Sequence, residues 1–82
     1  MAVVNFNDVV AINKRLKDNN IDYTIHSDSG CTCSGVTLRQ EGKVTPRHEI
    51  LKVINDYLYL HFMEVVEDDK DINKLNVISR FK

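Results

Sequence analysis

The sequence lacks most of the features that assign a protein to a chemical class. Its two cysteines are too few for the disulfide framework of a small secreted protein, so we expect free thiols. No apolar run approaches the roughly 20 residues that span a bilayer. The N-terminal segment has no basic region followed by a long apolar stretch. These absences predict a cytoplasmic protein with no membrane span and no secretory signal.

An excess of charge of either sign is lacking too. The chain of 82 residues has 11 basic and 12 acidic residues, and its formal net charge is −1. This balance indicates neither a strongly nucleic-acid-binding nor a strongly acidic protein. The length predicts one domain, residues 1–82, of marginal stability. Self-association is a common remedy for such a small domain.

Motifs that indicate catalysis are also missing. Only three glycines are present, and none belongs to a Gly-rich phosphate loop. There is no Gly-x-Ser-x-Gly elbow and no paired-histidine metalloprotease motif. A domain of this size has little room for a catalytic pocket. We therefore expect neither enzymatic activity nor a cofactor.

Three soft metal ligands occur close together in the sequence. If residues 29–30 form a two-residue hairpin loop, His26 faces Cys33 and shares one side of the hairpin with Cys31. With His48 as a fourth ligand, this set invites a zinc hypothesis. The spacing argues against it, because structural zinc sites usually have two to four residues between cysteines and here there is one. The sequence favours two small strand residues, so we expect no metal site.

Apolar periodicity predicts a first helix from Asn7 to Asp18. Its stripe recurs at spacings of three and four residues and consists of Phe6, Val9, Ile12 and Leu16. Asn7 is a suitable N-cap. Asn19 and Asn20 are a plausible end, because asparagine tolerates the left-handed conformation.

Three segments have the alternation of strands. They are residues 21–26, 31–40 and 75–81, and the last places Leu75, Val77 and Phe81 on one face. The resulting order is α-β-β-α-β. It predicts an α+β fold in which a three-stranded, mainly antiparallel sheet packs against two helices on one face. The alternative is a two-stranded hairpin with residues 75–81 paired elsewhere, for example across a dimer.

One long helix is predicted from Thr45 to Glu67. Thr45 is its cap and Pro46 its first residue, and no further proline or glycine follows. Its apolar residues cover an arc of roughly 200°, whereas a helix on a sheet needs only about 100–140°. The excess can be covered by the first helix, by a second copy of the chain, or by another protein.

The excess apolar surface predicts an interface on this helix. We expect a homodimer held partly by the helix, or a partner protein bound to it. The residues expected to contact the partner are Tyr59, His61, Phe62, Met63 and Val66. His61 is expected near the middle of the apolar arc, where protonation would weaken association.

A basic cluster supports a second hypothesis. Its residues lie around the start of the long helix and are Arg39, Lys43, Arg47 and Lys52. Helix N-termini also bind phosphate, so a nucleic-acid-binding regulator is the alternative function. Glu41 and Glu49 dilute the cluster, however, and no RNA-recognition aromatic motif or helix-turn-helix is evident.

The sequence therefore favours a small, non-enzymatic protein-interaction module that acts as a regulator or antagonist. Its composition adds one hint. Asn and Asp are abundant, while Ala occurs only at Ala2 and Ala11. This usage resembles that of small accessory proteins of AT-rich tailed phages, including the T-even group. The resemblance implies a viral accessory or host-takeover role.

Overall fold

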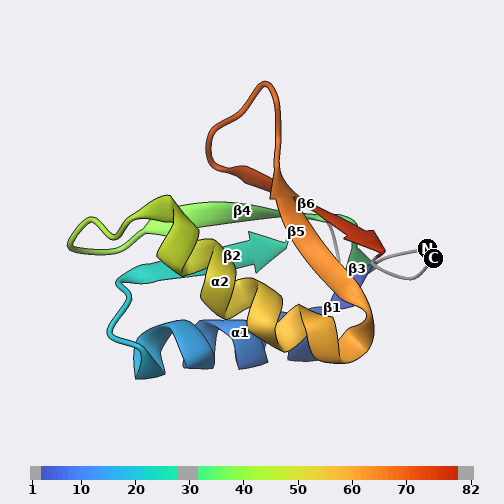
Figure 1. Ribbon diagram of the computed structural model, residues 1–82, viewed down its shortest axis with the longest axis horizontal. Coiled ribbons are helices and arrows are strands. Elements are labelled where there is room, and N and C mark those ends of the chain that lie inside the picture. Colours follow the sequence, from blue (N-terminus) through green and yellow to red (C-terminus); the bar gives the residue numbers. More distant parts are fainter. Residues whose placement is uncertain (1–2, 28–31, 80–82) are drawn as a thin grey trace.

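The computed structural model describes residues 3–27 and 32–79. Two helices pack on a four-stranded antiparallel sheet of order β2-β4-β6-β5 (Figure 1). The elements are β1 (Val4–Asn5), α1 (Phe6–Asp18), β2 (Tyr23–Ser27), β3 (Thr32–Cys33), β4 (Gly35–Gln40), α2 (Arg47–Leu58), the 3₁₀ turn η1 (Tyr59–His61), β5 (Met63–Glu67) and β6 (Lys74–Ser79). The short strands β1 and β3 pair separately. No helix in the described part of the chain is long and apolar enough to cross a membrane.

The predicted α+β class is confirmed, but the strand count and the element order were wrong. The long helix ends at Leu58, because η1 and the residue after it reverse the chain. Residues 63–67 then form β5, which pairs with all but the first residue of β6. β-branched Val65 and Val66 favour this extended conformation. The wide apolar arc was thus an artefact of placing a helix, a turn and a strand on one helical wheel.

The sheet consists of two similar units. Helix α1 is followed by the antiparallel pair β2–β4, and α2 is followed by the antiparallel pair β5–β6. The second strands of the two pairs, β4 and β6, join at the centre of the sheet, so β2 and β5 form its edges. The last predicted strand therefore pairs within the chain, and the alternative of pairing across a dimer is not needed. Phe81 lies outside the described residues.

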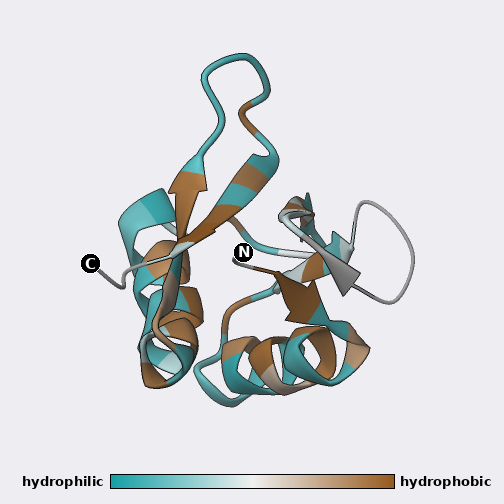
Figure 2. Cartoon of the chain, turned by 90° about the vertical axis from the view of Figure 1, so that its right-hand side faces the viewer, coloured by the Kyte–Doolittle hydropathy of each residue, from teal (hydrophilic) through white to brown (hydrophobic). Residues whose placement is uncertain are grey.

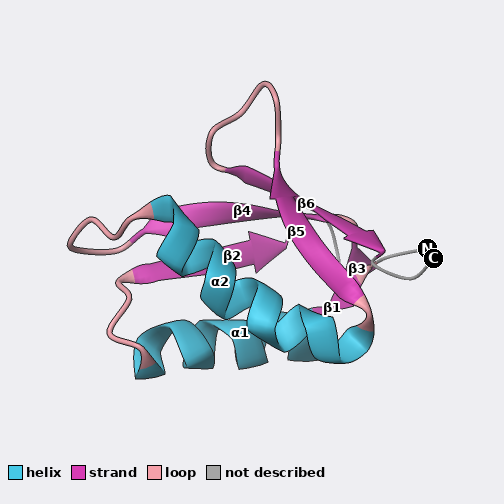
Figure 3. Ribbon diagram, viewed as in Figure 1, coloured by secondary structure: helices cyan, strands magenta, loops and turns pink. Residues whose placement is uncertain are grey.

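Both helices lie on one face of the sheet, with α1 along β2 and α2 along β5 (Figures 1 and 3). Figure 2 shows apolar and polar residues alternating along the β5–β6 hairpin, whose buried members Val65, Leu75 and Val77 belong to the core. The buried core consists of Val4, Val9, Ile12, Leu16, Ile21, Ile25, Val36, Leu38, Ile50, Ile54, Leu58, Val65, Leu75 and Val77. The other face of the sheet is uncovered by described residues.

The register of the first hairpin differs from the prediction by four residues. His26 pairs with Thr37 and not with Cys33. Cys33 instead pairs with Val4 of β1. Because the shift is even, the predicted apolar face stays buried, with Ile25 opposite Leu38. Cys31 lies outside the described residues, and the absence of a metal site stays a prediction.

The N-cap of helix α1 lies two residues earlier than predicted. Asn5, and not Asn7, is the N-cap, and it forms a capping box with Asp8. The Asp8 amide donates to Asn5 Oδ1 at 2.9 Å, and the Asn5 amide donates to Asp8 Oδ2 at 3.0 Å. Phe6 is consequently exposed and not part of the core stripe. The predicted end is confirmed, because Asn19 is the C-cap and Asn20 is left-handed.

Helix α2 also begins differently. The N-cap is Pro46 and not Thr45, and no side chain bonds to the free amides of the first turn. The end of the helix is better defined than its start, because the chain reverses directly after η1. Phe62 adopts the left-handed conformation (φ 60°), and its amide donates to the carbonyl oxygen of Tyr59.

A six-residue loop joins β5 to β6 and projects from the body of the molecule (Figure 1). Asp68 organises it. The hydrogen bond from Asn76, together with those from the Lys70 and Asp71 amides, lowers the pKa of the Asp68 carboxyl group. This loop also carries the exposed Ile72.

The capping box gives a test of the fold. Asn5→Ala is expected to lower the free energy of unfolding by about 1 kcal/mol, because the Asp8 amide loses its acceptor, Asn5 Oδ1. The matched control is Asn7→Ala, which lies on the exposed face of α1 and should be neutral or slightly stabilising. Urea unfolding followed by circular dichroism would compare them. A larger loss for Asn7→Ala would contradict the observed start of α1.

Candidate functional site

Large apolar side chains are exposed where α2 passes into β5. We call this segment, Tyr59–Phe62, the η1 corner. Tyr59 is 41% exposed, Leu60 is 68% exposed and Phe62 is 65% exposed. Three such side chains within four residues form a local concentration of apolar surface. Aromatic residues in exposed positions are enriched at protein interfaces.

The backbone of Phe62 is strained. A non-glycine residue with φ near 60° is uncommon, and for a bulky residue the left-handed conformation costs about 1–2 kcal/mol. Burial of the ring does little to offset this cost, because most of the side chain is exposed. A residue such as asparagine would satisfy the turn more easily. Strain of this kind clusters at functional sites, so Phe62 is a candidate for a binding role.

Tyr57 ties the corner to the first helix. Its hydroxyl donates to Asp8 Oδ1 at 2.7 Å, across the packed helices. Arg15 lies over the Tyr57 ring at 5.4 Å, and the His61 ring lies 5.0 Å from it. Burial raises the pKa of Tyr57 to about 12, with a further contribution from the hydrogen bond and charge of Asp8. The last turn before the corner is therefore held in place by polar and ring contacts.

The structure separates the five residues predicted to contact a partner. Tyr59, His61 and Phe62 lie together in the η1 corner. Met63 is half-buried and packs against the core. Val66 lies on the uncovered face of the sheet, because its neighbour Val65 points into the core. These residues do not share one helix edge, because the helix ends before them.

Two details of the predicted interface were wrong. His61 is exposed and its ring is tilted by 42° against the Tyr57 ring, so it does not lie in the middle of an apolar helix face. Leu60 was not among the predicted contact residues, yet it is among the most exposed apolar residues described. Only the chain reversal shows this, and no local sequence signal indicates it.

The basic residues do not form a single patch. Arg39 lies on the uncovered face of the sheet, 3.5 Å from Glu41. Lys52 belongs to α2 on the other face and forms an ion pair with Asp56. Arg47 is half-buried, and its Nη1 atom is buried without a hydrogen-bond partner. Lys43 lies in the loop before α2, where its amide donates to Asp22.

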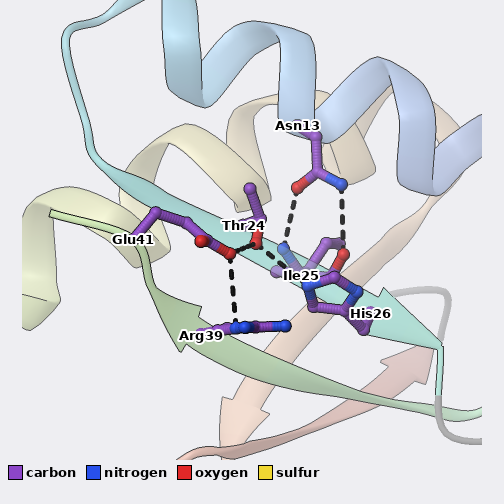
Figure 4. Close-up of polar contacts among 6 residues, drawn as sticks. All are labelled: Asn13, Thr24, Ile25, His26, Arg39 and Glu41. Carbon is purple, nitrogen blue, oxygen red and sulfur yellow. Dashed lines mark hydrogen bonds and ion pairs between the residues drawn. The ribbon is translucent and has the colours of Figure 1, made fainter.

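The uncovered face of the sheet carries a polar network that the sequence did not reveal (Figure 4). Thr24 donates to Glu41 Oε2 at 2.8 Å, and the same carboxylate faces Arg39. His26 Nε2 lies 3.0 Å from the Thr24 hydroxyl. The observed register of β2 and β4 brings these residues together. They are largely exposed, so the network fixes side-chain positions more than it stabilises the fold.

An open hollow of about 290 Å³ lies between the C-terminal part of α1 and α2. Its lining includes Arg15, Glu49, Lys52 and Asp56. Small-molecule sites are mostly apolar with few polar groups, and this hollow is mainly charged. In residues 3–27 and 32–79, no three His, Cys, Asp or Glu side chains are grouped to hold a metal ion. The η1 corner is thus the best-defined candidate site.

No protein family model, curated protein or solved structure matches this chain.

The Tyr57 contact predicts a specific pH dependence. Tyr57→Phe is expected to lower the free energy of unfolding by about 1.5 kcal/mol at neutral pH, because it removes a hydrogen bond to a carboxylate. The pKa of Tyr57 in the folded chain, about 12, exceeds the usual tyrosine pKa of 10.0. The contribution of Tyr57 is therefore fully present below pH 10 and is lost as the pH rises from 10 through 12.

Urea midpoints of wild type and Tyr57→Phe, measured from pH 8 to 12, would check this. Groups other than Tyr57 titrate alike in both chains, so the difference isolates Tyr57. The difference between the urea midpoints of wild type and Tyr57→Phe should become smaller above pH 10. A difference that stays constant or widens there would contradict the contact.

Proposed function

We propose that this protein acts by binding another protein through the η1 corner. The observation that supports this is Phe62, a large aromatic residue that is exposed and held in a strained backbone conformation. An aromatic side chain that fills a pocket on a partner contributes strongly to binding, and aromatic residues are enriched at such hot spots. The strain of Phe62 is compensated when the ring becomes buried in the complex.

The corner is also presented rigidly. The 3₁₀ turn limits the backbone, and the contacts of Tyr57 with Asp8 and His61 fix the preceding turn. A preorganised surface loses less conformational entropy on binding than a flexible loop does. Tyr59 and Leu60 flank the ring and extend the apolar area.

The proposed role is that of a small cytoplasmic regulator or antagonist without catalytic activity. The compositional resemblance to accessory proteins of tailed phages makes a host protein the proposed target. The partner bound by the η1 corner can also be a second copy of the chain, so the proposal includes a homodimer. The dispersal of Arg39, Lys43, Arg47 and Lys52 gives the nucleic-acid alternative no comparable support.

A matched pair of variants tests the corner. Phe62→Asn keeps the left-handed turn and removes the ring, while Ile72→Asn removes an equally exposed apolar residue from the distant β5–β6 loop. We expect Phe62→Asn to bind partner at least tenfold more weakly, which corresponds to about 1.4 kcal/mol. Its free energy of unfolding should be unchanged or about 1 kcal/mol higher, because strain is relieved. Ile72→Asn should bind like wild type.

The experiment is an affinity capture from lysate of the host cells, with and without nuclease, followed by titration of the captured protein. Light scattering of the purified chain reports self-association. Two results support the proposal: capture of a protein that survives nuclease, or a dimer of the purified chain. In either case Phe62→Asn should lose the interaction and Ile72→Asn should keep it. Equal binding by both variants would refute a role for the corner. Capture that disappears with nuclease would favour nucleic-acid binding instead.

A further inference from the structure

Both edges of the sheet are engaged by an asparagine from a helix. The edge strands β2 and β5 direct alternate backbone groups away from the sheet. Such groups are a template on which another strand can pair, and proteins need devices that prevent this. In this chain the same device occurs at both edges.

At the first edge, Asn13 of α1 bonds to the backbone of Ile25 in both directions (Figure 4). The Ile25 amide donates to Asn13 Oδ1 at 2.7 Å, and Asn13 Nδ2 donates to the Ile25 carbonyl oxygen at 3.1 Å. The side-chain amide therefore takes the place of a peptide group on a neighbouring strand. Ile25 is the central residue of β2.

At the second edge, Asn55 of α2 makes the corresponding contact. The Val65 amide donates to Asn55 Oδ1 at 2.8 Å, and Val65 is the central residue of β5. Each asparagine directly follows a fully buried isoleucine of its helix, Ile12 or Ile54. Each bonds to the first strand of the hairpin that follows its own helix. The bond from a central strand amide to an asparagine Oδ1 is thus repeated in the two α-β-β units.

Local preference does not explain these residues. Asparagine is a poor helix former, and both positions lie inside a helix. Both side chains are half-buried against the sheet edge. Their hydrogen bonds offset the cost of that placement. Because they satisfy backbone groups at the midpoint of each edge, they interrupt the template where a new strand would pair.

We propose that Asn13 and Asn55, the edge asparagines, prevent a second copy of this chain from adding to the sheet. This interaction surface is distinct from the η1 corner and does not depend on the proposed function. The occupant is a second copy because each edge, once freed, can pair with the same edge of another molecule. Antiparallel pairing of two identical edges satisfies two-fold symmetry and closes on itself.

The two edges give different outcomes for single and double variants. Asn13→Ala frees only β2, and Asn55→Ala frees only β5. Each single variant is therefore expected to pair through its one free edge and to have twice the mass of wild type. The double variant frees both edges of the same molecule. Its copies can add alternately through β2 and β5, so we expect open-ended assemblies that grow with concentration.

The experiment compares wild type, both single variants and the double variant by light scattering over a range of concentrations. The control is Ile54→Val, which weakens the core next to Asn55 and leaves both edge contacts in place. Circular dichroism confirms that each species is folded. A twofold mass increase in each single variant, larger assemblies in the double variant, and no change in the control are the expected results.

Folded variants that keep the wild-type mass at all concentrations would overturn the proposal, and so would an equal mass increase in the control. If an alanine variant does not fold, Asn13→Asp replaces it. This variant keeps an acceptor for the Ile25 amide, loses only the donor to the carbonyl group, and should associate more strongly than wild type. Hydrogen exchange of the wild-type chain gives a measurement that needs no variant. The Ile25 and Val65 amides should be protected, and exchange as fast as in the β5–β6 loop would also overturn the proposal.

Discussion

The pairing of β4 with β6 is the contact on which the rest of the structure depends. It joins Gly35, Val36 and Thr37 to Asn76, Leu75 and Lys74, and converts two hairpins into one sheet. A two-stranded hairpin alone is marginally stable at best. Hydrogen bonds from Leu38 to Asn73 and from Val77 to Ser34 extend the junction at both ends. Only the joined sheet offers a face wide enough for both helices, so the core, the edges and the η1 corner all follow from it.

Residues whose structure is set by nearby neighbours were predictable from the sequence. The stripe of Val9, Ile12 and Leu16 identified α1, and Asn19 and Asn20 identified its end. The apolar face of the first hairpin was also predictable, because alternation specifies a face without specifying the register. The register between β2 and β4 depends on the strand with which Thr32 and Cys33 pair, and that strand is β1. That choice is non-local, so no turn motif in the hairpin indicates it.

The boundary between α2 and β5 shows where such reasoning stops. Leu58 to Val66 contains apolar residues at helical spacing, and neither proline nor glycine interrupts it. Its conversion to turn and strand depends on β6, a partner eight or more residues further along the chain. The candidate site was therefore predicted only in part. Tyr59 and Phe62 were predicted as partner contacts and are exposed, while Leu60 was missed and Met63 and Val66 were given the wrong surroundings.

The repetition of the α-β-β unit has a consequence for how the chain can be divided. The strand order β2-β4-β6-β5 is symmetric about the centre of the sheet, because each unit contributes one edge strand and one central strand. Residues 41–46, which connect the units, contain no helix or strand. A break in that connection would leave two fragments, each with one helix, one hairpin and its own edge contact. The central junction between β4 and β6 is then an interface between complementary halves, so this small domain has the design of an intramolecular dimer.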